Sequence, residues 1–284
     1  MPELPEVDTL RRDLSRTVVG RRIERAELNR PKMLVAPTGL ALADLHGRTI
    51  RDLGRRAKLL LFGLSGDLTM AVHLKLAGQL IHRRGDVTVA AGGHPVPSFA
   101  APMPHRATHG RFDLDDGSVL WLTDIRQFGR VTLVPTALLP ALFDAKRLGI
   151  EPLGAEFTAE RLASTLRRHR TLPIKSALLD QANLAGLGNI YADEALHAAR
   201  VHPTRPAGAL SDEEIGGLSG AIRDVLTYAI EHGVADLPSG RARDGATFPR
   251  AHGRGGMPCL SCGAPIERIR IGTRSTDFCP ACQR

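Results

Sequence analysis

The chain has 284 residues, which is enough for two domains that each bury a core of their own. Its 38 lysines and arginines outnumber 30 aspartates and glutamates, and the formal net charge of +8 favours a polyanionic partner such as DNA or RNA, although a merely well-solvated basic protein fits the same balance. No apolar run approaches the roughly 18 to 20 residues of a membrane span and no signal-peptide core begins the chain, so we expect a cytoplasmic protein without a membrane segment.

The first predicted element is a helix that begins almost at the N-terminus, from Leu4 to Gly20. Apolar residues recur along one face of this helix, at Val7, Leu10, Leu14 and Val18. Gly20 can close the helix because glycine readily adopts the left-handed conformation. We therefore expect the first few residues to be held near a fixed surface.

Short leucine-rich or β-branched runs follow from about residue 23 to residue 134. Turn signals such as Ser65-Gly66-Asp67 separate several of them, and this pattern predicts a mainly antiparallel β domain. The stretch from Gly85 to Pro104 is rich in glycine, alanine and proline, so we predict a long surface loop there.

The pattern becomes helical after Pro135. Thr158 is placed to cap one helix, and Ser211 with Glu214 forms a capping box before a longer one. Helices are expected over residues 159–168, 174–180, 189–199 and 215–230. Residues 233–256 have weak periodicity and are predicted to be a loop.

All four cysteines lie near the C-terminus, in two Cys-x-x-Cys knuckles formed by Cys259, Cys262, Cys279 and Cys282. This spacing is typical of a zinc ribbon, and four thiolates would fill a tetrahedral site, so one structural Zn²⁺ is expected. Disulfides or an iron-sulfur site are the alternatives. Arg268, Arg270 and Arg274 fall on the expected hairpin between the knuckles, where they could contact phosphates or simply keep the module soluble.

Six segments then occur in one order along the chain: MPELPEV, GRRAKLLL, HLKLAGQL, TDIRQFGR, LLDQANLAGLGNIYADEAL and the C-terminal cysteine segment. Together they resemble the bacterial formamidopyrimidine-DNA glycosylase (Fpg, or MutM) family. The resemblance implies an α+β multidomain fold with an N-terminal antiparallel β-sandwich flanked by helices (residues 1–135), a helix-two-turns-helix domain (136–256) and a zinc finger (257–284). It also implies damaged double-stranded DNA as the partner of a monomeric repair enzyme.

The resemblance makes Pro2 the nucleophile of a bifunctional DNA glycosylase and lyase. Loss of Met1 would leave a secondary amine, and an α-amino group has a pKa of about 7.7 to 8.0, so an appreciable fraction is unprotonated near neutral pH. By the same resemblance Glu3 transfers a proton during opening of the sugar ring and Glu6 supports the site. From the residues alone, Pro2 and the two glutamates could merely start a helix and complement its positive end.

Further residues are assigned to DNA by the resemblance. Phosphate contacts are implied for Lys58 at the catalytic centre and for His73, Asn189 and Arg274. The side chains that fill the void left by a displaced nucleotide are implied to be Leu76, Arg126 and Phe128, with leucine where the family usually has methionine. Lys175 is implied near the lesion pocket, with Tyr191 and Glu194 as weaker candidates. Taken singly, His73 could be a core histidine, Asn189 a helix cap, Arg274 a surface charge and Phe128 a core aromatic.

Two other functions remain open from the sequence. An endonuclease VIII-like enzyme would use the same Pro2 chemistry on oxidised pyrimidines, and a zinc-dependent DNA-binding protein would need no catalysis. Residues 233–256 depart from the family pattern for the lesion-contacting loop, so the expectation of oxidised purines, 8-oxoguanine and formamidopyrimidines, is weaker than that of the reaction.

Overall fold

A computed structural model describes residues 1–232 and 248–284 of the chain. The chain divides into two compact units, Met1–Lys146 and Arg147–Arg284. The three-part division predicted above, with boundaries after residues 135 and 256, stays a prediction. Within the described residues, no helix is both long and apolar enough to cross a membrane.

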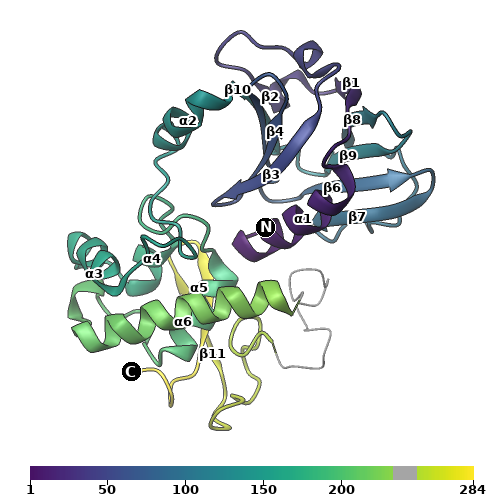
Figure 1. Cartoon of the computed structure of the whole chain (residues 1–284). Helices are drawn as coiled ribbons and strands as arrows, with labels where there is room; N and C mark the ends of the chain where they lie inside the picture. The colour runs from purple at the N-terminus through teal and green to yellow at the C-terminus, as the bar shows by residue number, and fades with distance from the viewer. Residues whose placement is uncertain (233–247) are drawn as a thin grey trace. The chain divides into compact units, whose positions relative to one another are not determined.

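The first unit is a β-sandwich with a helix packed against it (Figure 1). Helix α1 (Leu4–Val18) lies along the sandwich and buries the predicted apolar stripe of Val7, Leu10, Leu14 and Val18 in the core. Gly20 follows it with a φ of +87°, as expected of a helix-closing glycine. The predicted first helix is thus confirmed, and it fixes the N-terminus against the sheets.

Two five-stranded sheets form the sandwich of residues 1–146. One has the strand order β1-β8-β9-β6-β7 and the other β2-β10-β5-β4-β3, and every pairing is antiparallel except that of β10 with β2. The strands are β1 (Ile23–Leu28), β2 (Leu34–Val35), β3 (Ile50–Arg56), β4 (Leu59–Leu64), β5 (Leu68–His73), β6 (Gly78–Arg84), β7 (Val87–Gly93), β8 (Thr108–Leu114), β9 (Val119–Asp124) and β10 (Arg130–Pro135). Short helices η1 (Pro31–Met33), η2 (Leu42–Leu45), η3 (Thr136–Leu138) and α2 (Leu139–Ala145) complete the unit.

Strand β7 corrects the prediction of a continuous loop from Gly85 to Pro104. The glycines that suggested a loop instead allow close packing: a Cβ on Gly92 would lie 3.0 Å from the Leu10 side chain, and one on Gly93 only 2.3 Å from the Gly78 carbonyl oxygen. Small residues let this edge strand pair with β6 and pack beneath α1. The turn at Gly85-Asp86 and the part after Gly93 are the portions without helix or strand.

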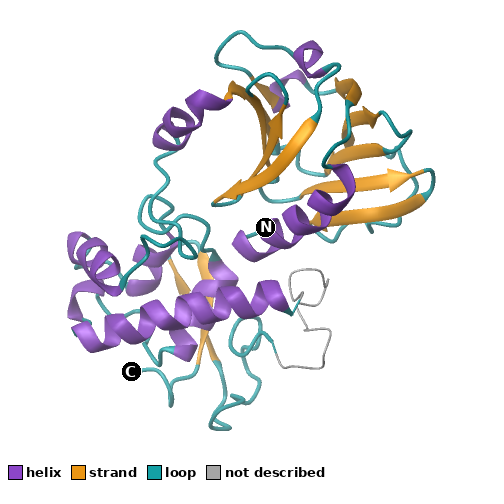
Figure 2. Cartoon of the chain, viewed as in Figure 1, coloured by secondary structure: helices purple, strands orange, loops and turns teal. Residues whose placement is uncertain are grey.

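The second unit is helical, as predicted (Figure 2). Its helices are α3 (Ala159–Arg168), α4 (Ile174–Leu179), α5 (Asn189–Ala198), η4 (Ala207–Ala209) and α6 (Asp212–Glu231). The Thr158 hydroxyl accepts the Arg161 N–H, and Ser211 and Glu214 cap α6 reciprocally, so both predicted caps are confirmed. A two-stranded hairpin, β11 (Glu267–Ile271) and β12 (Arg274–Phe278), lies between the cysteine knuckles.

Candidate catalytic N-terminus and nucleic-acid interface

The N-terminal residues are fixed by the start of α1. Pro2 is buried, and Glu3, which is the N-cap residue of α1, is only 3% exposed. The backbone N–H of Glu3 donates to Glu6 Oε2 at 2.7 Å. Glu6 therefore holds the start of α1 at Glu3, and its supporting role in catalysis stays a prediction. The predicted catalytic roles of Pro2 and Glu3 stay predictions.

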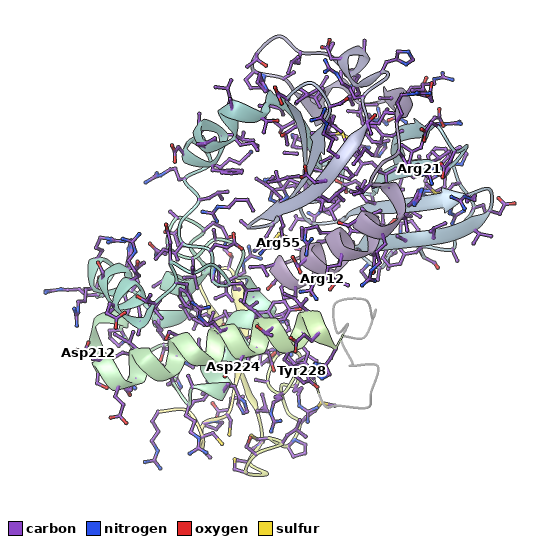
Figure 3. All side chains as sticks on the ribbon, viewed as in Figure 1. Arg12, Arg21, Arg55, Asp212, Asp224 and Tyr228 are labelled. Carbon is purple, nitrogen blue, oxygen red and sulfur yellow. The ribbon has the colours of Figure 1, made fainter. Side chains whose placement is uncertain are left out.

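An ion-pair chain that the sequence analysis did not predict joins α1 to the turn that carries Lys58. Asp8 on α1 accepts hydrogen bonds from Arg11 and Arg12 of its own helix and from Arg55 Nε at the end of β3. Arg12 and Arg55 are labelled in Figure 3. Burial acts to raise the pKa of Asp8, but the hydrogen bond and charge of Arg11 and the charges of Arg55 and Arg12 outweigh it, and the pKa lies below its ordinary value.

The same Arg55 side chain reaches the residue before Lys58. Arg55 Nη1 donates to the Ala57 carbonyl at 2.9 Å, and Ala57 has a φ of +53° in a tight turn between β3 and β4. Lys58 follows in that turn, 6% exposed and directly before β4 begins at Leu59. The i,i+3 and i,i+4 spacing of Arg11 and Arg12 from Asp8 was visible in the sequence, but the third partner from β3 was not.

Strand register brings the predicted DNA contacts of the first unit to one end of the sandwich. Leu59, which follows Lys58, pairs with His73, and His73 pairs on its other side with Arg130. Gly78 pairs with Asp124 in the opposite sheet. The segments that cross between the sheets, 74–77 and 125–129, are therefore neighbours at this end.

His73 is placed there as a neutral hydrogen-bond donor. Its Nδ1 accepts the backbone N–H of Lys75 at 2.9 Å, so the ring proton is on Nε2. Burial, together with the charges of Lys75, Lys146 and Lys58, lowers the pKa of His73 to about 3. The imidazole is uncharged near neutral pH, and the three lysines supply a positive field that suits a phosphate.

The predicted void-filling side chains project from the two crossing segments. Leu76 is half-buried, whereas Phe128 is 45% exposed and Arg126 is exposed. The Arg126 guanidinium carbon lies 5.3 Å from the centroid of the Phe128 ring, so the two side chains stack. Strand register thus places Leu76, Arg126 and Phe128 at the same end of the sandwich as His73, and their contacts with DNA stay predictions.

The second unit places its two predicted phosphate contacts beside each other. Asn189 is the first residue of α5, and its Nδ2 donates to the Ser275 carbonyl at 3.0 Å. The exposed Arg274 precedes Ser275 at the start of β12. A helix N-terminus and an arginine on the hairpin are therefore adjacent, an arrangement that suits a phosphate.

Lys175, which was predicted to lie near the lesion pocket, is in the interior of the second unit, and its contact with DNA stays a prediction. Its ammonium is fully buried, 2.6 Å from Asp193 Oδ1, and donates to the Ser275 carbonyl and to Thr276 Oγ1. No surface of this side chain is available to a base in this conformation. Lys175 instead ties α4 and α5 to β12, and these are the elements that hold Asn189 and Arg274.

Tyr191 and Glu194, the weaker candidates, support the chain rather than face solvent. The Glu194 carboxylate accepts the backbone N–H groups of Arg250, Ala251 and His252 at 2.7–2.8 Å. Burial raises the pKa of Glu194, although these three hydrogen bonds act to lower it. The Tyr191 ring, also buried, lies 6.0 Å from that of Phe248. Both residues fix residues 248–252 against α5.

The four cysteine sulfurs lie within 4.8 Å of one another, with 3.4 Å between those of Cys262 and Cys279. Such a set fits one tetrahedral Zn²⁺ with no open position, and the metal is structural. His197 Nε2 lies 3.4 Å from the sulfur of Cys259, a contact to a zinc ligand that sequence spacing did not indicate. The site would join the hairpin to the last turn of α5.

Three parts of the chain match family models. Residues 1–131 match the formamidopyrimidine-DNA glycosylase N-terminal domain, residues 148–238 match the formamidopyrimidine-DNA glycosylase H2TH domain, and residues 256–284 match the zinc finger found in FPG and IleRS. The chain belongs to the formamidopyrimidine-DNA glycosylase family. The resemblance, the α+β class with its three kinds of domain, and the expectation of one structural zinc are thereby confirmed.

Relatives and solved structures match over the full length. The formamidopyrimidine-DNA glycosylase of Heliobacterium modesticaldum is 44% identical over 290 residues, covering 100% of both chains, and that of Desulforamulus reducens is 40% identical over 291 residues, covering 100% of this chain and 99% of the relative. A crystal structure of wild-type Lactococcus lactis Fpg (MutM) with DNA containing N7-benzyl-Fapy-dG has a TM-score of 0.87 and 31% identity, covering 100% of both chains. A complex of Lactococcus lactis Fpg with DNA containing an abasic site has a TM-score of 0.85 and 31% identity, covering 99% of both.

Proposed function

We propose that this protein removes an oxidised purine from duplex DNA and then cleaves the strand through a Schiff base on Pro2. Membership of the formamidopyrimidine-DNA glycosylase family makes it a DNA glycosylase of base excision repair, with damaged DNA as its partner. The observation that supports the proposal is that one unit holds the N-terminal turn, Lys58 and His73 in fixed positions. Glu6 fixes the turn at Glu3, Arg55 links Asp8 of α1 to the turn before Lys58, and His73 keeps an N–H donor at Nε2.

The first step requires a free Pro2 amine. While Met1 is attached, the Pro2 nitrogen is an amide and its lone pair is delocalised, so removal of Met1 creates the nucleophile. The amine forms a bond to C1′ as the glycosidic bond breaks, and the base departs with that electron pair and takes up the proton that the Pro2 nitrogen loses. Glu3 donates a proton to O4′ as the C1′–O4′ bond opens, which leaves an iminium ion.

The iminium ion then drives strand cleavage. It withdraws electrons from C2′, so loss of the C2′ proton expels the 3′ phosphate, and a second proton loss expels the 5′ phosphate. Water finally hydrolyses the C1′–nitrogen bond and returns the free amine. Lys58, His73, Asn189 and Arg274 are proposed to hold the backbone phosphates during these steps.

Base preference is proposed to be for 8-oxoguanine and formamidopyrimidines. The relatives carry the name formamidopyrimidine-DNA glycosylase, and one solved Lactococcus lactis Fpg complex contains Fapy-dG DNA. Another contains an oxidised pyrimidine, which keeps the endonuclease VIII-like alternative in view. The departure of residues 233–256 from the family pattern bears on this choice, and residues 233–247 lie outside the described part of the chain.

A substrate panel with end analysis tests this function. Duplexes with 8-oxoguanine, formamidopyrimidine or thymine glycol are incubated with protein lacking Met1, and the products are separated by size. The proposal predicts faster excision of the two purine lesions and a gap with phosphate at both ends. Faster release of thymine glycol would favour the pyrimidine alternative, and intact strands with every lesion would contradict the enzyme proposal. Size-exclusion chromatography with light scattering should give the mass of one chain, as the proposed monomer requires.

A further inference from the structure

The geometry points to Asp124 as the positioning residue for segment 125–129, whose Arg126 and Phe128 are the proposed void-filling side chains. The inference rests on the proposed function, because it assigns Asp124 the task of presenting those side chains to the gap in the duplex. Asp124 ends β9 in one sheet, and Arg130 begins β10 in the other, so the segment must cross from sheet to sheet.

The Asp124 carboxylate holds both ends of this crossing. Its Oδ1 accepts the Arg126 N–H at 2.9 Å and its Oδ2 accepts the Gly129 N–H at 2.7 Å. The Asp124 carbonyl accepts the Gln127 N–H at 3.2 Å. One fully buried residue therefore binds the backbone on each side of Phe128.

The backbone of segment 125–129 has an unfavourable conformation that needs these hydrogen bonds. Gln127 has a φ of +59°, a left-handed conformation that costs a residue with a Cβ of the order of 1 kcal/mol. Gly129 must approach the carboxylate closely, since a Cβ there would lie 3.2 Å from Asp124 Oδ2. The hydrogen bonds to Asp124 offset this cost and turn the Arg126 and Phe128 side chains into their stacked, exposed arrangement.

Asp124 is itself held firmly. Its N–H donates to the Ala107 carbonyl at 2.8 Å, and its carbonyl lies 3.1 Å from Nε2 of the buried His109. It also pairs with Gly78, directly after the segment that carries Leu76. The buried Asp124 carboxylate therefore fixes the backbone that carries Arg126 and Phe128 to the rigid end of β9.

The test compares Asp124→Asn with a matched control. The amide keeps one acceptor and turns the other oxygen into a donor that faces a backbone N–H, so one of the two hydrogen bonds is lost at almost no change in volume. Asp116→Asn is the control: Asp116 lies before the other end of β9, and its Oδ1 accepts the N–H of Ser118 with the same two-residue spacing. The control alters a turn that carries none of the proposed DNA contacts.

Cleavage of an abasic site is measured in duplex and in single-stranded DNA. Only a duplex has a gap to fill once the nucleotide is displaced, and displacing the nucleotide costs a few kcal/mol. Asp124→Asn should therefore lower kcat/KM on the duplex by roughly 10- to 100-fold, and on the single strand by less than about threefold. Asp116→Asn should change neither. Equal losses on both substrates, or no loss in the duplex, would overturn the inference while leaving the proposed function intact.

Two further results separate the remaining cases. If Asp124→Asn does not fold, Gly129→Ala serves instead, because its methyl group would push against Asp124 Oδ2 and Met33 Cε, and the same selective duplex loss is expected. Equal losses with that variant would again refute the inference. A wild-type protein lacking Met1 that cleaves neither substrate would refute the proposed function itself.

Discussion

Replacing the buried Lys175 with methionine should destabilise the second unit. Lys175 and Asp193 form an ion pair of 2.6 Å in which both side chains are fully buried. Methionine fills a similar volume but leaves the Asp193 carboxylate without its main cation. Breaking such a pair by removing one partner costs about 3–5 kcal/mol, a large part of the roughly 5–15 kcal/mol that stabilises a domain.

Urea unfolding followed by circular dichroism at 222 nm measures this loss, because the second unit is the helical one. With a denaturant slope of about 1–3 kcal/mol per M, the midpoint of the helical transition should fall by roughly 1–5 M. Lys32→Met, at an exposed residue of the other unit, is the control and should leave the midpoint unchanged. If Lys175→Met unfolds at the same urea midpoint as the control but loses DNA affinity, the stabilising role is wrong and the predicted DNA contact is supported.

Three further outcomes follow from the site geometry. Arg55→Met and Asp8→Asn should each lower abasic-site cleavage by roughly tenfold. The double variant should be little worse than either single one, because both substitutions break the same chain of ion pairs between α1 and the Lys58 turn. Additive losses would show independent roles. Since the pKa of His73 is about 3, His73→Ala should weaken binding to a duplex with a stable abasic analogue by the same factor at pH 5.5 and pH 8; a loss that grows as the pH falls would indicate a cationic histidine. Removing zinc with a chelator, or Cys262→Ser, should abolish DNA binding while the near-ultraviolet signal of Trp121 in the sandwich persists; full binding without metal would contradict a structural zinc.

Local signals in the sequence predicted the elements well where one segment decides its own structure. The stripe of Leu10 and Leu14 predicted α1, and the Ser211-Glu214 capping box predicted the start of α6. Strand β7 was missed because its glycines and alanines show no alternation of apolar and polar side chains. They are required by contacts with Leu10 and with Gly78, which lie elsewhere in the chain.

The candidate site could be predicted as a set of residues but not as an arrangement. Family motifs named His73 and Arg126, whereas their proximity depends on the register of β5 with β10 and of β6 with β9. The same limit explains why the buried position of Lys175 was not predicted. Its segment resembles the family, but its partners, Asp193 and the start of β12, come from distant positions in the chain. Long-range pairing of this kind has no local signature.

Borohydride trapping on DNA with an abasic site tests the central claim about Pro2 most directly. Borohydride reduces an iminium ion to a stable amine, so a protein–DNA adduct records the bond between the N-terminus and C1′. Protein that begins at Pro2 should give an adduct whose DNA is attached to its N-terminal peptide in mass spectrometry, and protein that retains Met1 should give none. An adduct of equal yield with Met1 retained, or attachment to a lysine in the correctly processed protein, would contradict the account.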